Sequence, residues 1–195
     1  MKLNLYLIPS LGSNCIDDGY QPIKNKLKDK FNVIYSNINW KNSSITEWSK
    51  QFTQHYLSTK AIKNIIVGFS YGAMTAINAT TNLSPNELIL CSLSPFFSEY
   101  LNKLPKTWIR SESKKRLYGF KNCSIEKIAK SIIDKKINIH LMVGEKELKI
   151  WPSMKSATFE FNKILKPKDF IIVSKARHRL EENYQNELIK LLQHL

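Results

Sequence analysis

Short apolar, β-branched runs alternate with longer segments of helical periodicity along these 195 residues, and this alternation constrains the fold more than any other feature. The runs expected to form strands are Leu3–Ile8, Phe31–Tyr35, Ile65–Val67, Leu88–Leu93, Ile137–Val143 and Phe170–Val173. Between them, apolar residues recur at helical spacing, as in Ile45, Trp48, Phe52 and Tyr56. Such alternation is typical of a mostly parallel sheet with right-handed crossovers and helices on both faces. The sequence therefore predicts an α/β fold around a six-stranded sheet.

One interval departs from this alternation. About forty residues separate Pro95 from Lys136, more than a single crossover helix requires. The part that follows Ser124, a candidate N-cap, has an ordinary helical pattern, whereas residues 96–123 are expected to form a small inserted lid. No linker or internal repeat interrupts the chain, so residues 1–195 are expected to form one domain.

The chain is strongly basic, with 30 Lys and Arg against 16 Asp and Glu and a net charge of +14. Nearly all the basic residues are lysine, and isoleucine and asparagine are also abundant, so an A/T-rich coding sequence is one explanation of the charge. Attraction to an acidic partner is the other. Because the charge is spread along the chain and no nucleic-acid-binding module is present, we expect no nucleic-acid partner.

The cysteines and the hydropathy bear on the environment of the protein. Cys15, Cys91 and Cys123 are odd in number and lack metal-ligand spacing, which favours a reduced, cytoplasmic setting without a bound metal. No run of eighteen apolar residues exists, and the short apolar start lacks the pattern of a signal peptide. We therefore expect a cytoplasmic protein without stable membrane insertion.

The segment Gly68-Phe69-Ser70-Tyr71-Gly72 lies between an expected buried strand and a helix rich in small residues. A serine at this point must turn sharply from strand to helix, with its hydroxyl exposed at the carboxyl edge of the sheet. Small flanking residues are required because the backbone passes close to its neighbours. This pattern predicts a nucleophilic Ser70.

With this motif, the chain resembles the α/β-hydrolase superfamily over nearly its whole length. The resemblance implies a nucleophile, an acid and a histidine in that chain order. It selects Glu147, three residues after Gly144, as the acid, with Glu145 as the competitor in the same turn. It selects His178 as the base, because this residue follows the last expected strand. The other histidines, His55, His140 and His194, fall in a helix, in the middle of a strand and next to the C-terminus.

The resemblance also implies a mechanism and the groups that support it. His178 would take the proton of Ser70, and Glu147 would orient the imidazole. The backbone N–H groups of Tyr71 and Leu11 would bind the oxyanion, with Ser10 as the alternative to Leu11. The expected substrate is a small-molecule carboxylic ester or thioester, and no metal or organic cofactor is required. A non-catalytic interaction protein on the same scaffold is the alternative from another functional class.

The expected lid is the most basic part of the chain, with seven basic residues and one acidic residue in 101–121. Lys114, Lys115 and Arg116 could hold an acidic handle, such as a carrier protein or coenzyme A linked to the acyl group. The competing interpretation is a solvated, lysine-rich surface.

Overall fold

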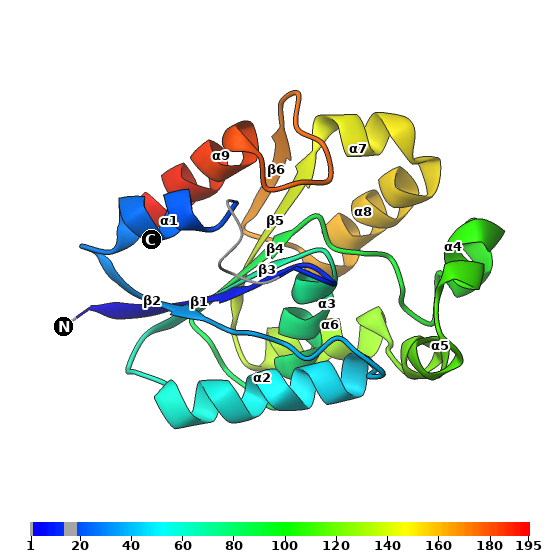
Figure 1. Ribbon diagram of the computed structural model, residues 1–195, viewed down its shortest axis with the longest axis horizontal. Helices are drawn as coiled ribbons and strands as arrows, with labels where there is room; N and C mark the ends of the chain where they lie inside the picture. The colour runs from blue at the N-terminus through cyan, green and yellow to red at the C-terminus, as the bar shows by residue number, and fades with distance from the viewer. Residues whose placement is uncertain (1, 14–18) are drawn as a thin grey trace.

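A single parallel sheet organises the computed structural model, which describes residues 2–13 and 19–195 (Figure 1). Its strands are β1 (Leu3–Ile8), β2 (Phe31–Tyr35), β3 (Asn64–Phe69), β4 (Glu87–Cys91), β5 (Asn138–Gly144) and β6 (Asp169–Val173). The strand order is β2-β1-β3-β4-β5-β6, and every neighbouring pair is parallel. The predicted six-stranded parallel sheet is thus confirmed. β4 ends two residues earlier than expected, because Ser92 has a φ of 49° and turns the chain away from the sheet.

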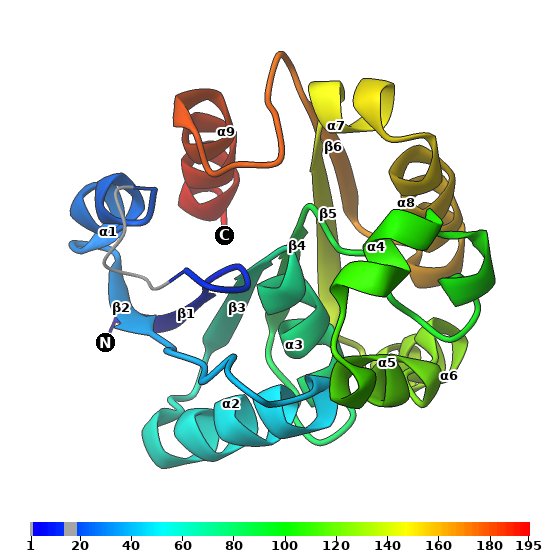
Figure 2. The same cartoon turned by 45° about the vertical axis from the view of Figure 1, so that its right-hand side comes forward.

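Helices cover both faces of the sheet, as predicted (Figure 2). They are α1 (Gln21–Leu27), α2 (Ile45–Thr59), α3 (Tyr71–Ala79), α4 (Lys106–Ser111), α5 (Lys114–Lys121), α6 (Ile125–Asp134), α7 (Glu145–Ile150), α8 (Pro152–Leu165) and α9 (Glu182–Gln193), with a 3-10 turn at Leu101–Lys103. Helices α1 and α9 pack on one face, and α2, α3, α6 and α8 pack on the other.

The central strands are buried on both faces, which explains their unbroken apolar runs. In β1, Tyr6 and Ile8 join the core under α2 and α3, whereas Leu5 and Leu7 join the core under α1 and α9. The same alternation holds in β3 and β4. Each central strand therefore ties the two cores together.

The strands end at one common edge, which brings the loops that follow them together. Registered pairs at this edge are Ile8 with Gly68, Phe69 with Cys91, Cys91 with Met142, and Gly144 with Val173. Because all the strands are parallel, the loops that carry Ser70, Glu147 and His178 all leave from the same side of the sheet.

The segment 96–123, between β4 and α6, contains the 3-10 turn, α4 and α5 (Figure 1), and α5 packs against α2. The beginning of this segment is anchored on α8. The rings of Phe97 and Tyr100 pack edge-on against Phe161, with centroid distances of 5.4 and 5.3 Å. Phe161 is fully buried, so it joins this segment to the core.

Two of the three cysteines fall within the described residues. Cys91 and Cys123 are buried free thiols, and Cys15 lies outside the described residues. In residues 2–13 and 19–195, no group of three or more His, Cys, Asp or Glu side chains is placed to hold a metal ion. None of the helices in this part of the chain combines the length and apolar character needed to cross a membrane.

Replacing Phe161 with alanine should destabilise the protein by about 3–5 kcal/mol, because it leaves a cavity between α8 and the segment 96–123. Phe159→Ala is the matched control, since Phe159 lies on the same helix but is 39% exposed, and it should cost less than about 1 kcal/mol. Urea unfolding of the two variants measures both values. Equal losses would contradict this account of the anchor.

Candidate active site

Ser70 stands at the turn between β3 and α3 in a strained backbone conformation. Its φ is 57° and its ψ is −116°, which a non-glycine residue rarely adopts. The Ser70 N–H donates to the Cys91 carbonyl, as if the sheet continued, while the Ser70 carbonyl accepts the N–H groups of Ala73 and Met74 at the start of α3. Ser70 is therefore hydrogen-bonded to the sheet through its N–H group and to the helix through its carbonyl group.

The two glycines that flank Ser70 permit this turn. A Cβ atom on Gly68 would lie 2.3 Å from the Gly72 carbonyl oxygen. A Cβ atom on Gly72 would lie 2.4 Å from the carbonyl oxygens of Ile8 and Pro9. Both positions exclude any side chain, because carbon and oxygen atoms cannot approach so closely.

Three residues that are remote in sequence form one hydrogen-bonded chain. His178 Nε2 lies 2.9 Å from Ser70 Oγ, and His178 Nδ1 lies 2.7 Å from Glu147 Oε2. The structure thus brings together Ser70, His178 and Glu147. His55 and His140 are elsewhere: His55 contacts Ser36, and His140 lies between the carboxylates of Glu87 and Asp169.

The Glu147 carboxylate is buried and receives several donors. Its Oε1 accepts the backbone N–H of Gly144 at 2.9 Å and the hydroxyl of Ser92 at 2.6 Å. Ser92 also lies 3.1 Å from the Tyr184 hydroxyl, whose pKa is raised well above its usual value by burial. By contrast, Glu145 is at the surface and pairs with Lys149 and the N–H of Lys175. Glu147, and not Glu145, therefore faces the histidine.

Aromatic rings hold the His178 imidazole from two sides. The Trp151 ring meets it nearly edge-on at a centroid distance of 5.4 Å, and the Phe69 ring lies at the same distance at a tilt of 56°. The imidazole remains partly exposed, with 27% of the side chain accessible. Its orientation is thus set by packing as well as by Glu147.

Two backbone segments next to Ser70 were expected to bind an oxyanion. Tyr71 is the first residue of α3, where N–H groups have no partner within the helix. Leu11 lies in a tight turn in which the Ser13 N–H donates to the Ser10 carbonyl and Gly12 has a φ of 78°. This turn consumes the Ser13 N–H rather than that of Leu11. The roles of Tyr71, Leu11 and Ser10 stay predictions.

A cavity of about 230 Å³ opens beside Ser70 and His178. Its other lining residues are Tyr71, Ser94, Pro95, Phe96, Trp108, Ser111, Glu112, Trp151 and Met154. Four of these come from the segment 96–123, so this segment forms one wall of the cavity. About half of the lining side chains are aromatic or apolar and the others are polar, a mixture that suits a small-molecule site.

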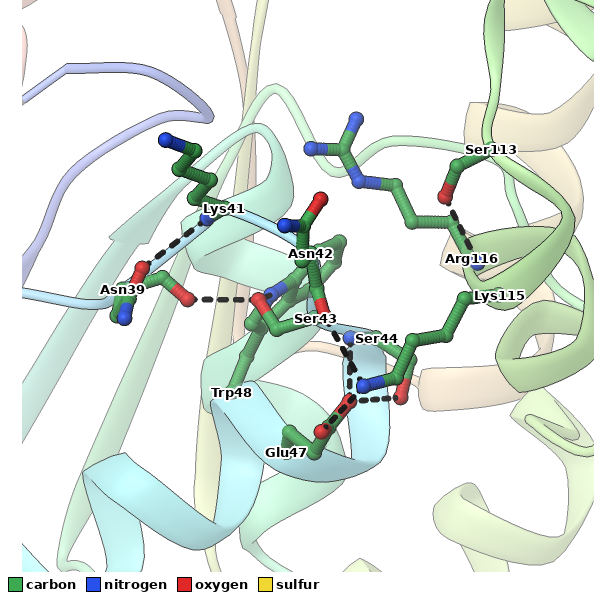
Figure 3. A network of polar contacts seen from close by, with 10 residues as sticks. All are labelled: Asn39, Lys41, Asn42, Ser43, Ser44, Glu47, Trp48, Ser113, Lys115 and Arg116. Atoms are coloured by element: carbon green, nitrogen blue, oxygen red, sulfur yellow. Dashed lines mark hydrogen bonds and ion pairs between the residues drawn. The ribbon is translucent and has the colours of Figure 1, made fainter.

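The basic residues expected to form a substrate handle lie outside the lining of this cavity. Lys115 donates to Glu47 Oε1 at 2.7 Å and to the Asn42 carbonyl at 2.9 Å (Figure 3). Arg116 donates to Glu112 and to the Trp40 carbonyl, each at 3.2 Å. Two of the three side chains therefore hold α5 against the rest of the protein. Lys114 is exposed, and the substrate handle stays a prediction.

The Arg116–Glu112 pair also reaches Tyr71, the residue directly after Ser70. The Tyr71 hydroxyl donates to Glu112 Oε1 at 2.6 Å, and burial, followed by the Glu112 charge, raises the pKa of this phenol above its usual value. The wall formed by the segment 96–123 is thus joined to the start of α3 by a partly buried hydrogen bond.

Sequence reasoning missed two serines in the loop after β4. Ser92 donates to Glu147, and Ser94 Oγ lies 3.0 Å from Ser70 Oγ. A partial signal was available for Ser94, because it directly follows the expected strand Leu88–Leu93, whereas Ser92 fell inside that expected strand. Only the positive φ of Ser92 shows why both side chains turn toward the site.

Comparison with known proteins places this architecture in a fold class. No protein-family model and no curated protein matches the sequence. Among solved structures, the chain is similar to Est1E from Butyrivibrio proteoclasticus, with 10% identity, a TM-score of 0.75 and coverage of 99% of this chain and 86% of that one. It is also similar to MGS-MChE2, an α/β hydrolase enzyme from the metagenome of lagoon sediments at Mar Chica, Morocco. That match has 14% identity and a TM-score of 0.69, and it covers 100% of this chain and 90% of that one.

A third similar structure is an uncharacterized protein from Bacillus cereus, with 15% identity and a TM-score of 0.66. The match covers all of this chain but only 59% of the length of that protein. At these identities the likeness defines the fold. The chain has the α/β-hydrolase fold, as the resemblance predicted.

Glu147→Gln should destabilise the protein by about 2 kcal/mol, because an amide group would direct its NH₂ at donors that now bind a carboxylate. Glu145→Gln, in the same turn but at the surface, should change stability by less than about 0.5 kcal/mol. Urea unfolding at neutral pH measures the difference. A larger loss of stability in Glu145→Gln than in Glu147→Gln would show that Glu147 is not the buried acceptor of these hydrogen bonds.

Proposed function

We propose that this protein is a serine hydrolase that cleaves a carboxylic ester or thioester through an acyl-enzyme on Ser70. The observation that carries the proposal is the continuous chain Ser70 Oγ, His178 Nε2, His178 Nδ1 and Glu147 Oε2, with contacts of 2.9 and 2.7 Å. The fold alone would not justify the proposal, because one fold hosts many functions. The MGS-MChE2 structure, which has the same fold, is that of an α/β hydrolase enzyme.

In the proposed reaction, Ser70 attacks the carbonyl carbon of the substrate while His178 takes its proton as general base. The resulting imidazolium then gives this proton to the leaving group. Glu147 keeps the Nδ1 proton on His178, so that Nε2 is the basic nitrogen, and stabilises the charged ring. The buried thiol of Cys91 does not compete as a nucleophile, because burial raises its pKa far above neutral pH.

The oxyanion that forms in this step requires preorganised donors. In this proposal they are the N–H of Tyr71 at the start of α3 and the N–H of Leu11 in the turn after β1, with Ser10 as the alternative to Leu11. The close approach of Gly72 to the carbonyls of Ile8 and Pro9 supports this arrangement, because it brings that turn next to the start of α3.

In this proposal the cavity binds an apolar acyl group of modest size. Phe96, Trp108, Trp151 and Met154 present aromatic and aliphatic surface beside Ser70. In this proposal the segment 96–123 acts as a small lid that closes over the acyl group.

Ser70→Ala should abolish both labelling by a fluorophosphonate probe and hydrolysis of short p-nitrophenyl esters, because it removes the nucleophile. Ser111→Ala is the matched control, since Ser111 lines the same cavity but donates to the Trp108 carbonyl. This variant should be labelled like the wild type. Gel fluorescence and release of p-nitrophenolate provide the measurements.

Two outcomes of this experiment would contradict the proposal. Unchanged labelling of Ser70→Ala would place the nucleophile elsewhere. A folded wild-type protein that is neither labelled nor active would favour a non-catalytic interaction protein instead.

A carrier-linked or coenzyme A-linked acyl group is a second candidate substrate. It is favoured by the exposed basic residues Lys106, Arg110 and Lys114, which lie on the segment that forms the cavity wall. Their field would attract an anionic substrate. Lys115 and Arg116 are unsuitable for a test, because reversing them would also break the ion pairs that hold α5.

The triple variant Lys106→Glu, Arg110→Glu, Lys114→Glu should lower kcat/KM for an acyl-coenzyme A thioester by about tenfold or more at low ionic strength. It should leave kcat/KM for a neutral p-nitrophenyl ester unchanged. The matched control reverses three exposed lysines on α1, just after α1 and on α9, namely Lys26, Lys28 and Lys190. Equal losses in the two triple variants would rule out a specific handle on the cavity wall.

A further inference from the structure

The Ser94 hydroxyl is buried beside the proposed nucleophile but plays no part in the Ser70–His178–Glu147 chain. Its Oγ lies 3.0 Å from Ser70 Oγ, and Ser94 lines the same cavity as Ser70 and His178. Ser94 follows the turn at Ser92, so the loop after β4 supports the acid with one serine and contacts the nucleophile with the next.

The available protons determine the direction of the Ser94–Ser70 hydrogen bond. An ionised Glu147 only accepts, so His178 Nδ1 is the donor in their contact, and Nε2 of the neutral imidazole is then an acceptor. Ser70 has a single proton and gives it to Nε2. Ser94 must therefore donate its own proton to Ser70 Oγ.

Acylation would remove the partners of both Ser94 and His178. Once Ser70 Oγ is bonded to an acyl carbon, it is an ester oxygen without a proton and a poorer acceptor. After the leaving group has departed with the proton, His178 Nε2 is again a free acceptor. Both groups contacted Ser70 Oγ, so Ser94 Oγ and Nε2 lie no more than about 6 Å apart, a span that one water molecule can bridge.

We propose that Ser94 positions the water that hydrolyses the acyl-enzyme, an inference that rests on the proposed acyl-enzyme at Ser70. The water donates one hydrogen to His178 Nε2 and the other to Ser94 Oγ, which leaves an oxygen lone pair for the acyl carbon. Its oxygen bonds to that carbon while one proton passes to Nε2. The bond from the carbon to Ser70 Oγ then breaks, and the proton returns from Nε2 to Ser70. The products are a carboxylic acid and free Ser70, and Ser94 keeps its proton throughout.

This role affects deacylation and leaves acylation nearly unchanged, so kinetics can separate the two. With p-nitrophenyl esters, the activated leaving group makes acylation fast and deacylation limiting. Under these conditions kcat reports deacylation and kcat/KM reports acylation. Loss of the Ser94 hydroxyl should then lower kcat and KM together.

The test compares wild type, Ser94→Ala and Ser94→Thr on a short p-nitrophenyl ester. The control is Ser58→Ala, since Ser58 lies on α2 outside the cavity and donates to the His55 carbonyl. Ser94→Ala should lower kcat by about tenfold or more, with kcat/KM kept within about twofold. Intact-mass spectrometry during turnover should show acyl-enzyme accumulating in Ser94→Ala above the wild-type level. Ser94→Thr, which retains a hydroxyl, should recover most of kcat, and Ser58→Ala should match the wild type in all three quantities.

Two results would overturn the role of Ser94. One is an equal fall of kcat and kcat/KM in Ser94→Ala, which would mean that the hydroxyl assists the nucleophile. The other is wild-type kcat and wild-type acyl-enzyme occupancy in Ser94→Ala. Failure of the wild type itself to turn over the ester or form an acyl-enzyme would instead contradict the proposed function.

Discussion

The buried carboxylate of Glu147 is the interaction on which the rest of the site depends. A charge removed from water is tolerated only if it is paired and hydrogen-bonded, and Glu147 accepts from Gly144, Ser92 and His178. Ser92 and His178 lie in the loops after β4 and β6, and Gly144 is the last residue of β5. The carboxylate therefore fixes the loops after β4, β5 and β6 relative to one another, and its position determines where the imidazole can lie.

The sheet supplies the other constraint, because its parallel strands end in register. Close backbone approaches then complete the site: Gly68 against Gly72, and Gly72 against the carbonyls after β1. A Cβ on Gly144 would likewise lie 2.6 Å from the Ala176 carbonyl oxygen, in the loop that carries His178. Glycine is scarce in this chain, with six residues in all, and half of them lie at these contacts.

The fold and the three residues of the hydrogen-bonded chain could be predicted from the sequence, for different physical reasons. Periodicity reveals which segments are buried on one face or on two, and the unbroken apolar run Ile65–Val67 indicated that β3 is buried on both faces. The motif around Ser70 requires a specific backbone turn, and that turn has a local sequence signature. Glu147 and His178 came from the resemblance, which supplied the chain order that local patterns lack.

The parts that sequence reasoning missed depend on where side chains point after a turn. The sequence places Ser92 inside an expected strand and Ser94 just after it, and only the positive φ of Ser92 shows that the chain turns toward the site there. Lys115 and Arg116 illustrate the converse. Charge counting grouped them as free surface charges. Lys115 instead pairs with Glu47 on α2, and Arg116, besides its local pair with Glu112, donates to the Trp40 carbonyl; the contacts to Glu47 and Trp40 depend on the tertiary fold.

The pairing of the few acidic side chains has a consequence for the whole surface. Glu47 binds the N-terminus of α2 with one oxygen and Lys115 with the other, Glu112 is held by Tyr71 and Arg116, and Glu147 is buried. These carboxylates neutralise charges at fixed points. Among the described residues, only Lys103, Lys115 and Lys149 lie within ion-pair distance of a carboxylate, so most of the lysines there have no paired acidic side chain. The protein therefore presents itself to its surroundings as a polycation, whose excess charge must be balanced by a diffuse cloud of dissolved anions.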